Sequence, residues 1–458
     1  MSPDPRLMIS VSGIRGRVGH GLTPDVVARY AAAFGAWAIA RGTARTIVLG
    51  RDSRVSGPLF HAVTRAALES VGADVIDIGL TTTPTLQLAV EHHHAAGGLG
   101  ITASHNPIEW NALKFIGPDG LFLSAAQGAE MRALVEQGIP YATWDRLGQV
   151  HFDGEAITRH IDQVLALPFI DVPGIRSRKF RVAFDACHGA GGEVIPRLLE
   201  LLGCEVHAIG LTADGRFPRP PEPVAEQLTD LEALVTKTGA AVGFATDPDV
   251  DRLALVSDGG KAIGEDYTLA LATRVVLRHR TGPVVTNLST SRIVDDMAGE
   301  SGARVLRAPV GEVNVALTMR EAGAVIGGEG NGGVILPELH LGRDAPLGVA
   351  LILQLLHEAA EPLSAIVARF PRYAIVKDKL DRPDAPLDAV YAQLRSAFPD
   401  AEADTQDGLR LSWPDRWVHV RPSGTEPIVR VIAEAPTRDG AQALVDRGRQ
   451  LLAVLSKQ

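Results

Sequence analysis

The stretch Arg45-Thr-Ile-Val-Leu-Gly50 is a short β-branched run, and a second such run follows at Asp74-Val-Ile-Asp-Ile78. Apolar side chains recur at helical spacing between them, at Phe60, Val63, Ala67 and Val71. A strand, a helix and another strand in this order are typical of a βαβ unit in a mostly parallel sheet. This stretch therefore predicts an α/β fold.

The same alternation begins again twice further along the chain. A second unit starts at Phe180-Arg-Val-Ala-Phe-Asp185 and a third at Pro283-Val-Val-Thr-Asn287. After Phe370-Pro371 the pattern changes to strand-like runs and one long helix, which indicates a smaller α+β module. The sequence thus predicts three tandem α/β domains with mixed sheets and a C-terminal α+β domain, with bounds at 1–155, 156–258, 259–370 and 371–458.

Composition narrows the class of protein. The 458 residues suffice for about three domains of ordinary size, and 45 Lys and Arg against 54 Asp and Glu give a net charge of −9. Nucleic acid is a poor partner for this balance, because phosphate backbones bind clustered Lys and Arg. The apolar blocks at 30–40 and 345–356 are too short to cross a bilayer and predict buried helices. The N-terminus shows no secretory signal, and two cysteines make no disulfide framework. We expect a cytoplasmic protein without a membrane partner.

The first motif that carries chemistry is Ile101-Thr-Ala-Ser-His-Asn-Pro107. It ends a strand with a hydroxyl at a loop tip, next to an imidazole that can move a proton. Ser104 is therefore a candidate nucleophile or phosphate carrier. An ordinary turn is the alternative, since Ser, Asn and Pro are common turn residues.

The second motif is Thr246-Asp-Pro-Asp-Val-Asp-Arg252, directly after a strand-like run. Carboxylates at alternate positions of an extended loop can all turn to one side, and three of them suit a hard divalent cation such as Mg²⁺. The alternative is a solvated acidic turn.

The third motif is Ile326-Gly-Gly-Glu-Gly-Asn-Gly-Gly333. Its glycines allow the backbone to approach a ligand closely, while Glu329 and Asn331 can bond sugar hydroxyls. It is neither a dinucleotide-binding fingerprint nor a P-loop. A flexible surface loop is the alternative.

The fourth motif is Arg421-Pro-Ser-Gly-Thr-Glu-Pro427, with Arg430 close behind. An arginine fork, two hydroxyls and an exposed backbone at glycine together suit a phosphate. A tight hairpin is the alternative.

Local charge supports an anionic ligand. The first 54 residues hold eight arginines against three acidic residues, inside a chain that is acidic overall. Most of these arginines are expected on a solvated basic surface. Ser12-Gly-Ile-Arg-Gly16 places Arg15 on a glycine-flanked loop, and Arg15 is the one we expect to face the site.

The four motifs, in this order and at these separations, resemble the α-D-phosphohexomutase family over essentially the whole chain. Thr102-Ala-Ser-His-Asn-Pro107 is similar to the phosphoserine loop of that family, and Asp247-Pro-Asp-Val-Asp-Arg252 to its metal loop. Gly328-Glu-Gly-Asn-Gly332 is similar to its sugar-specificity loop, and Arg421-Pro-Ser-Gly-Thr-Glu426 to its phosphate-binding loop. The resemblance implies four domains around a central cleft.

The resemblance also implies a mechanism. A phosphorylated Ser104 would donate its phosphoryl group to a hexose monophosphate, the resulting 1,6-bisphosphate would reorient, and the other phosphate would return to the serine. Asn111-Ala-Leu-Lys-Phe115 matches the family as well. The implied roles are catalysis for Ser104, His105, Arg15, Lys114 and Arg252, ligation of one Mg²⁺ for Ser104, Asp247, Asp249 and Asp251, and substrate binding for Glu329, Asn331, Arg421, Ser423, Gly424, Thr425 and Arg430.

The sugar is less clearly marked than the reaction. Bacterial phosphoglucosamine mutases usually read Gly-Glu-Gln-Ser-Gly-His in the specificity loop, whereas Gly330, Asn331 and Gly333 stand here in place of the middle pair and the histidine. This form resembles the archaeal type of phosphoglucosamine mutase, and Pro309-Val-Gly-Glu-Val-Asn314 fits the same subgroup, although the family more often has Asp where Glu312 stands. We favour glucosamine phosphate over a broad phosphomannomutase/phosphoglucomutase specificity.

Two other readings of the motifs are testable. A hydrolase with an aspartate nucleophile would release phosphate to water, but gives no reason for Ser104 or for the loop at Arg421. A non-catalytic sugar-phosphate sensor would bind without interconverting the 1- and 6-phosphates. We expect an enzyme that is a monomer or a homodimer, with a hexose 1,6-bisphosphate as activator.

Overall fold

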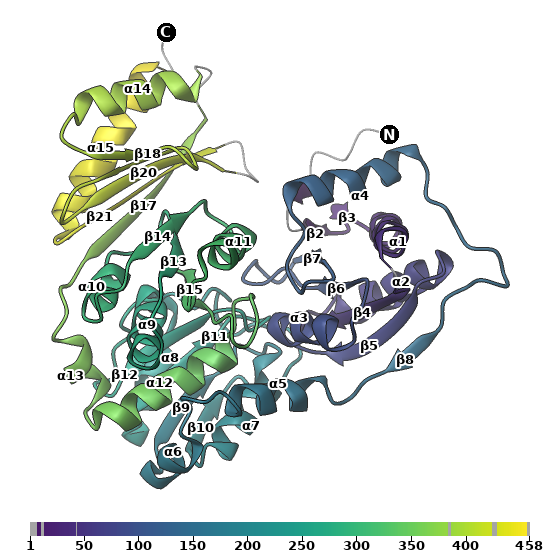
Figure 1. Cartoon of the computed structure of the whole chain (residues 1–458), viewed down its shortest axis with the longest axis horizontal. Helices are drawn as coiled ribbons and strands as arrows, with labels where there is room; N and C mark the ends of the chain where they lie inside the picture. Colours follow the sequence, from purple (N-terminus) through teal and green to yellow (C-terminus); the bar gives the residue numbers. More distant parts are fainter. Residues whose placement is uncertain (1–6, 11–12, 43, 383–385, 424–427, 456–458) are drawn as a thin grey trace.

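The structure is a computed structural model that describes residues 7–10, 13–42, 44–382, 386–423 and 428–455. Four successive units follow the chain in Figure 1, each built on its own sheet. Unit I has eight strands, units II and III have four each, and unit IV has five. The predicted architecture of three α/β domains and a different C-terminal domain is confirmed, while the exact domain bounds stay a prediction.

Units I to III repeat one strand topology that the sequence did not reveal. Each of these units contains four strands that, numbered in chain order among themselves, lie in the order second, first, third, fourth. The fourth runs antiparallel to the third. In unit II these strands are β9 (Arg181–Asp185), β10 (Glu205–Ile209), β11 (Val242–Thr246) and β12 (Leu253–Ser257). In unit III they are β13 (Val284–Asn287), β14 (Val305–Ala308), β15 (Ile326–Glu329) and β16 (Gly333–Ile335).

Unit I contains the same four strands within its larger sheet. They are β4 (Thr46–Arg51), β5 (Asp74–Leu80), β6 (Gly97–Ile101) and β7 (Trp110–Ile116). The remaining strands are β1 (Met8–Ser10), β2 (Gly13–Val18), β3 (Gly21–Leu22) and β8 (Val150–Phe152).

This repeat places the first three motifs, which contain Ser104, Asp247 and Glu329, at equivalent positions in units I, II and III. Each lies at the carboxyl end of the third strand, where the chain turns back into the fourth. Ligands of open α/β sheets bind outside the carboxyl ends of the strands. The topology therefore brings residues around Ser104, Asp247 and Glu329 toward one region.

The apolar blocks predicted as buried helices are confirmed. They lie in α1 (Pro24–Arg41) and α12 (Ala345–Ala359), and both helices begin with a proline in the first turn, where its missing N–H costs nothing. The other helices of units I and II are α2 (Gly57–Ser70), α3 (Thr83–His92), α4 (Ala125–Gln137), α5 (Ala156–Leu165), α6 (Val172–Arg178), α7 (Gly191–Leu201) and α8 (Thr229–Thr238). Unit III adds α9 (Asp266–His279), α10 (Ile293–Gly299), α11 (Glu312–Ala322) and α13 (Leu363–Val367).

Units II and III share one continuous apolar core. It joins Phe184 and Phe244 of unit II to Ile326 and Leu351 of unit III. Helix α12 lies against both α9 and α5, so it links the two units (Figure 1). The second and third units therefore share one core beneath the aspartate loop and the glycine-rich hairpin, which follow β11 and β15.

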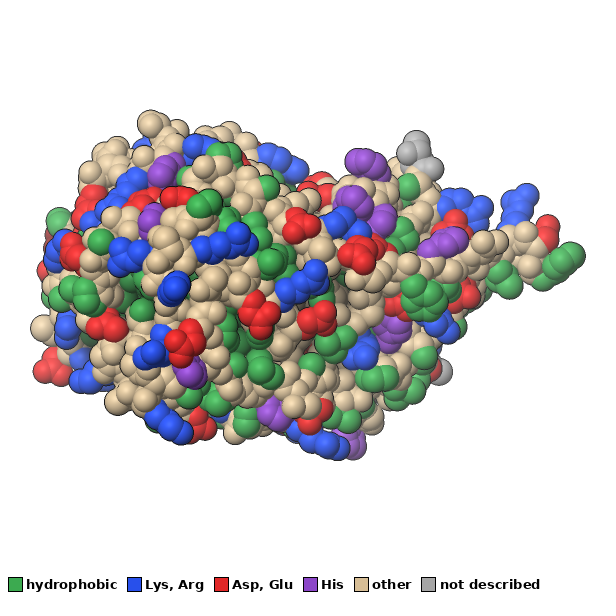
Figure 2. All heavy atoms as spheres, turned by 90° about the horizontal axis from the view of Figure 1, so that it is seen from below, with side chains coloured by type: hydrophobic (Ala, Val, Ile, Leu, Met, Phe, Trp, Pro, Cys, Tyr) green, Lys and Arg blue, Asp and Glu red, His purple; other side chains and the backbone are tan. Residues whose placement is uncertain are grey.

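Unit IV is an antiparallel sheet with two helices on one face (Figure 1). Its elements are β17 (Ala374–Asp381), α14 (Leu387–Ala397), β18 (Glu402–Asp404), β19 (Leu409–Ser412), β20 (Trp417–Pro422), β21 (Ile428–Ala435) and α15 (Arg438–Leu455). Throughout the described part of the chain, no helix has the length and apolar character needed to cross a membrane. Figure 2 shows Lys and Arg side chains interspersed with Asp and Glu on the face seen from below.

Candidate active site

A cavity of about 730 Å³ lies where the four units meet. Its lining includes Arg15 and Ser104 from unit I, Arg252 from unit II, Glu329 from unit III and Arg421 from unit IV. Members of all four sequence motifs therefore face one space, as the resemblance implied.

Ser104 lies in a buried turn at the end of β6. Its hydroxyl donates to Asp247 Oδ2 at 2.7 Å, and His105 Nδ1 lies 3.3 Å from Ser104 Oγ. Its backbone is left-handed, with φ of 49°, a conformation that is uncommon outside glycine. The serine loop of unit I thus meets the aspartate loop of unit II directly.

Arg54 holds this unusual turn in place. Its Nη2 donates to the carbonyl oxygens of Ser104 and Asn106, both at 2.6 Å, and its Nη1 donates to Pro107 and Trp110. The side chain is fully buried. Most arginines of the first 54 residues were expected on a solvated basic surface, and Arg54 is an exception, because its guanidinium satisfies backbone carbonyls that a tight turn leaves without strand partners.

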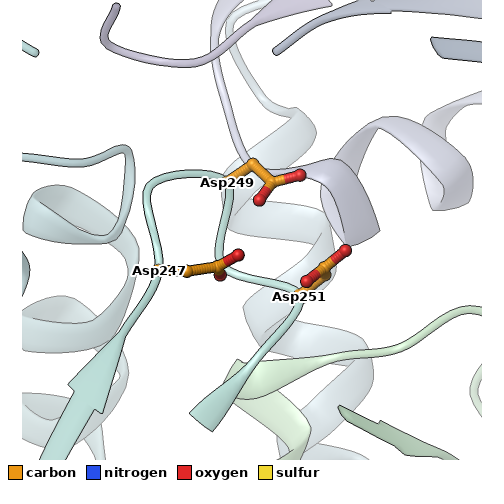
Figure 3. A group of neighbouring side chains, drawn as sticks. All are labelled: Asp247, Asp249 and Asp251. Atoms are coloured by element: carbon orange, nitrogen blue, oxygen red, sulfur yellow. The ribbon is translucent and has the colours of Figure 1, made fainter. Parts of the chain in front are cut away.

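The three aspartates converge, as predicted. One carboxylate oxygen from each of Asp247, Asp249 and Asp251 lies within 4.8 Å of the others, and all three residues are buried, which excludes a solvated acidic turn (Figure 3). The loop is not extended, however. Val250 adopts a left-handed φ of 64°, and its buried side chain turns inward to the core, so the chain folds back between the two outer carboxylates.

Burial and neighbouring charges shift the pKa values of Asp247 and Asp249 in opposite directions. Burial and the two neighbouring carboxylates raise the pKa of Asp247 well above its ordinary value. Burial also raises the pKa of Asp249, but Lys114, at 2.6 Å, more than compensates and holds it below the ordinary value. A cation bound among the three would relieve the repulsion between carboxylates that contributes to the raised pKa of Asp247.

The donor set fits a divalent metal ion. Asp249 Oδ1 and Asp251 Oδ1 are buried and accept no hydrogen bond from the residues that the structure describes. A buried carboxylate oxygen without a partner costs free energy. Hard oxygen ligands from three carboxylates are the set that Mg²⁺ prefers. The residues present are therefore able to hold one.

Two basic residues of unit I approach the serine from neighbouring strands. Lys114 lies on β7, and Arg15 donates from Nη1 to Asn106 Oδ1 at 3.3 Å. Arg15 was expected on a loop, but it lies within β2 and pairs with Ala112 of β7. The flanking Gly13 serves packing, since a Cβ there would lie 1.9 Å from the Leu113 carbonyl oxygen.

His105 and Arg252 line the cavity next to the serine. Burial, followed by the charge of Arg252, lowers the pKa of His105 well below its ordinary value, so the imidazole is neutral at pH 7. Arg252 donates from Nη1 to Glu222 at 2.9 Å, and its backbone N–H donates to Asp247. All catalytic candidates named from the sequence are therefore near Ser104.

The glycine-rich motif is a hairpin rather than a flexible loop. Glu329 ends β15, and its Oε1 accepts from Asn287 Nδ2 at 2.8 Å and from the Gly311 N–H at 3.1 Å. Asn331 lines the cavity beside it and turns back through its Oδ1 to the Gly333 N–H. Close approach explains Gly328, because a Cβ there would lie 2.1 Å from the Gly333 carbonyl oxygen.

Arg343 and Glu312 are site residues that the sequence analysis did not assign to the site. Burial lowers the pKa of Arg343, but Asp251, Glu329 and Glu312 together raise it well above its ordinary value. Both side chains line the cavity. The one signal in the sequence was the form of the segment around Glu312, because the partners of Arg343 come from the aspartate loop, the end of β15 and the start of α11.

In unit IV, Arg421 and Arg430 face the cavity from adjacent strands. Ser423 directly follows β20, and its N–H donates to the Ile428 carbonyl oxygen. The predicted Gly424 and Thr425 lie outside the described residues. Arg421 Nε donates to Asp407 Oδ2 at 2.8 Å, and the other donor to that oxygen is the Val310 N–H of unit III, at 3.1 Å.

His419 of unit IV lies buried at the contact with unit III and forms hydrogen bonds with both units. It is fully buried, its Nε2 lies 2.6 Å from the Asp407 carbonyl oxygen, and its Nδ1 lies 2.9 Å from Ser289 Oγ. A carbonyl only accepts, so Nε2 carries the proton and the neutral ring accepts from the serine. Burial lowers the pKa of His419 to about 4.

We expect acid to weaken this contact. Because the folded pKa of His419 lies below the unfolded value of 6.5, the unfolded chain binds the extra proton, and stability falls as the pH drops from 6.5 toward 4. The full effect is on the order of 3 kcal/mol. Melting temperatures of wild type, His419→Gln and the exposed control His94→Gln should be compared between pH 7.5 and 5. His419→Gln should show a shallower decline than the other two, and equal slopes would contradict the expectation.

Known protein families match the chain in the same order as the units. Four family models of phosphoglucomutase/phosphomannomutase match the chain. They describe alpha/beta/alpha domain I (residues 6–141), domain II (158–260), domain III (264–373) and the C-terminal domain (374–450). Together they span nearly the entire chain.

Individual relatives agree. A protein named probable phosphoglucosamine mutase from Methanopyrus kandleri is 39% identical over 95% of both chains. A phosphoglucomutase/phosphomannomutase from Thermococcus kodakarensis is 36% identical and covers 96% of this chain and 97% of its own. A crystal structure of a phosphoglucomutase/phosphomannomutase family protein from Burkholderia thailandensis matches with a TM-score of 0.84 at 27% identity, over 98% and 97% of the two chains. The chain therefore belongs to the α-D-phosphohexomutase family of isomerases.

Proposed function

We propose that this enzyme interconverts hexose 6-phosphate and hexose 1-phosphate through a phosphorylated Ser104 and a hexose 1,6-bisphosphate, with glucosamine phosphate as its preferred substrate. One observation carries the proposal. A buried serine hydroxyl lies 2.7 Å from Asp247, inside a cavity lined by all four units. Burial of Ser104 limits its contact with water, which would hydrolyse a phosphoserine.

Each transfer exchanges one P–O bond for another. The free hydroxyl of the hexose monophosphate forms a bond to phosphorus while the bond to Ser104 Oγ breaks. The proton of that hydroxyl passes to a base in the cavity, and Ser104 Oγ takes up a proton. The bisphosphate then reorients, and its other phosphoryl group moves to Ser104 Oγ, which gives up its proton while the released sugar oxygen takes one. His105, with Nδ1 at 3.3 Å from Oγ, is a candidate for moving a proton. Lys114, Arg15 and Arg252 supply positive charge around the phosphoryl oxygens.

A single Mg²⁺ completes this charge balance. Asp247, Asp249 and Asp251, with an oxygen carried by Ser104, would hold it. When bound, the ion neutralises charge on phosphoryl oxygens. The buried Oδ1 atoms of Asp249 and Asp251, which accept no hydrogen bond from the described residues, support this assignment.

Reorientation requires a grip on the phosphate that is not being transferred. Arg421 and Arg430 line the cavity from unit IV, and an arginine fork suits a phosphate in either orientation of the sugar. The predicted Ser423, Gly424 and Thr425 would complete this cradle. Glu329 and Asn331 would contact hydroxyls that both orientations share. Asp407, which now accepts from Arg421, would yield to the phosphate or share the guanidinium with it.

The sugar preference rests on the specificity loop and on relatives' names. The loop form Gly328-Glu-Gly-Asn-Gly-Gly333 favours the archaeal type of phosphoglucosamine mutase, and the relative at 39% identity carries that name. The relative at 36% is named phosphoglucomutase/phosphomannomutase, which favours broad specificity as the second candidate.

A coupled assay separates these candidates. Glucosamine, glucose and mannose 6-phosphates are each supplied with Mg²⁺ and catalytic hexose 1,6-bisphosphate, and formation of the 1-phosphates is followed. We expect interconversion, with kcat/KM highest for glucosamine phosphate by about tenfold or more. Comparable values for all three would overturn the glucosamine preference and leave the mutase. Binding without interconversion would overturn the mutase and support a sensor.

A further inference from the structure

Arg343 is a buried arginine that joins three separate segments of the site. It immediately precedes α12 and uses a different nitrogen for each carboxylate that it contacts. Its Nη2 donates to Asp251 Oδ2 at 2.7 Å, its Nη1 to Glu329 Oε2 at 2.8 Å, and its Nε to Glu312 Oε2 at 2.9 Å. One planar guanidinium thus connects the aspartate loop of unit II to two segments of unit III.

The specificity hairpin is shaped to admit this side chain. A Cβ added to Gly333 would lie 2.2 Å from Arg343 Cδ and 2.8 Å from its Cγ. Gly333 has no positive φ, so space alone requires the glycine. Gly333 stands where related loops carry histidine, and the Arg343 side chain occupies the space that a larger side chain at this position would need.

The base of the arginine is anchored as well. The next residue, Asp344, caps α12 by accepting from the Leu347 N–H at 2.8 Å. Its other oxygen accepts from His160 Nε2 at 2.8 Å and from His340 Nε2 at 2.9 Å, and all three residues are buried. His160 lies on α5, so the anchor draws on an element outside unit III. Neither end of Arg343 is left to move.

These contacts fix the carboxylates relative to one another. Arg343 holds Oδ2 of Asp251 and leaves Oδ1, which accepts no hydrogen bond from the described residues. Glu329 is held through Oε2 by Arg343 and through Oε1 by Asn287 and Gly311. The Arg343 guanidinium therefore links the carboxylate of Asp251, on the metal side, to that of Glu329, on the sugar side, and helps to set the distance between them.

We propose that Arg343 is a positioning residue that sets the spacing between Asp251 and Glu329, and so aligns the sugar hydroxyl with the phosphoryl group on Ser104. The inference rests on the proposed function and adds a residue to it. The three contacts require a planar fork, because a lysine ammonium concentrates its donors at one point and cannot meet three separated carboxylates with equal geometry. Misalignment should impair transfer more than binding, since Arg421 and Arg430 grip the distal phosphate from another unit.

The test compares Arg343→Ala, Arg343→Lys and Gly333→Ala with wild type in the mutase assay. A misplacement of about 1 Å can cost about 100-fold in rate. We expect kcat to fall about 100-fold in Arg343→Ala and about tenfold in the other two, with KM for the sugar phosphate changed less than about threefold. Guanidinium ion at millimolar concentration should restore part of the rate of Arg343→Ala, whereas methylammonium should not.

Arg274→Ala is the matched control, because it removes a unit III arginine that pairs with the exposed Glu300. It should keep wild-type kinetics. A lower melting temperature with no change in kcat per folded enzyme, or equal rescue by the two ions, would assign Arg343 a structural role and overturn the proposal. If Arg343→Ala does not fold, the Lys and Gly333 variants decide. Absence of interconversion in wild type would instead overturn the proposed function.

Discussion

Ser104→Ala is expected to abolish interconversion of hexose 6- and 1-phosphates, with kcat reduced by about 10⁴-fold or more. Loss of a nucleophile removes the covalent route altogether, and comparable losses of serine nucleophiles reach about 10⁶-fold. The hydroxyl is the phosphate carrier in the proposed cycle, and no other described hydroxyl lies within hydrogen-bond distance of Asp247. Sugar phosphate binding should persist in the variant, because Arg421 and Arg430 line the cavity from unit IV.

The matched control is Ser70→Ala. Ser70 ends α2, and its hydroxyl donates to the Ala67 carbonyl oxygen at the helix end, so its loss should leave kcat unchanged. Kinetics should be measured with calorimetric binding of glucosamine 6-phosphate to both variants. If Ser104→Ala released phosphate to water at the wild-type rate while Asp247→Ala did not, the enzyme would be a hydrolase with an aspartate nucleophile.

Asp249→Asn is expected to give the second largest effect. The amide keeps the shape of the carboxylate but removes one negative charge from the group that would hold Mg²⁺. Electrostatic stabilisation by a metal is worth several kcal/mol, so kcat should fall by about 10² to 10⁴-fold. Affinity for Mg²⁺, measured directly by calorimetry, should fall by at least about tenfold.

Direct measurement of Mg²⁺ binding matters because Asp249 also holds Lys114 and Thr83 at 2.6 Å each. Loss of rate alone would not separate the metal from these two contacts. The control is Asp230→Asn, an exposed carboxylate in the first turn of α8, which should bind Mg²⁺ as wild type does. Unchanged Mg²⁺ affinity in Asp249→Asn would contradict the assignment of the three aspartates.

Much of the fold and the main loops of the site could be predicted from the local sequence. The βαβ alternation predicted the α/β units, and the change of pattern after Phe370-Pro371 predicted the different last domain. Ser104 and the three aspartates were identified because nucleophiles and metal ligands occur as short motifs whose chemistry is visible in neighbouring residues. The turn of the aspartate loop was not, since it depends on the buried Val250 side chain.

The residues that the sequence did not assign correctly act at long range. Arg54 reaches carbonyl oxygens about 50 positions away, and Arg343 reaches Asp251 across 92 positions. An isolated arginine in a sequence is most often solvated, and only packing shows that these two are buried with partners. The common core of units II and III was hidden for the same reason, because α12 follows the third sheet but also packs on α5.

The most direct test follows the phosphoryl group itself. Wild-type enzyme is mixed with Mg²⁺, glucosamine 6-phosphate and a trace of hexose 1,6-bisphosphate, and phosphorus NMR records the sugar phosphates while mass spectrometry locates phosphate on the protein. We predict that the 6- and 1-phosphates reach equilibrium with phosphate on Ser104 and none released to water. The phosphoserine mutase would be contradicted by inorganic phosphate that accumulates without the 1-phosphate, by equilibration in wild type while Ser104 stays unmodified, or by equilibration in Ser104→Ala.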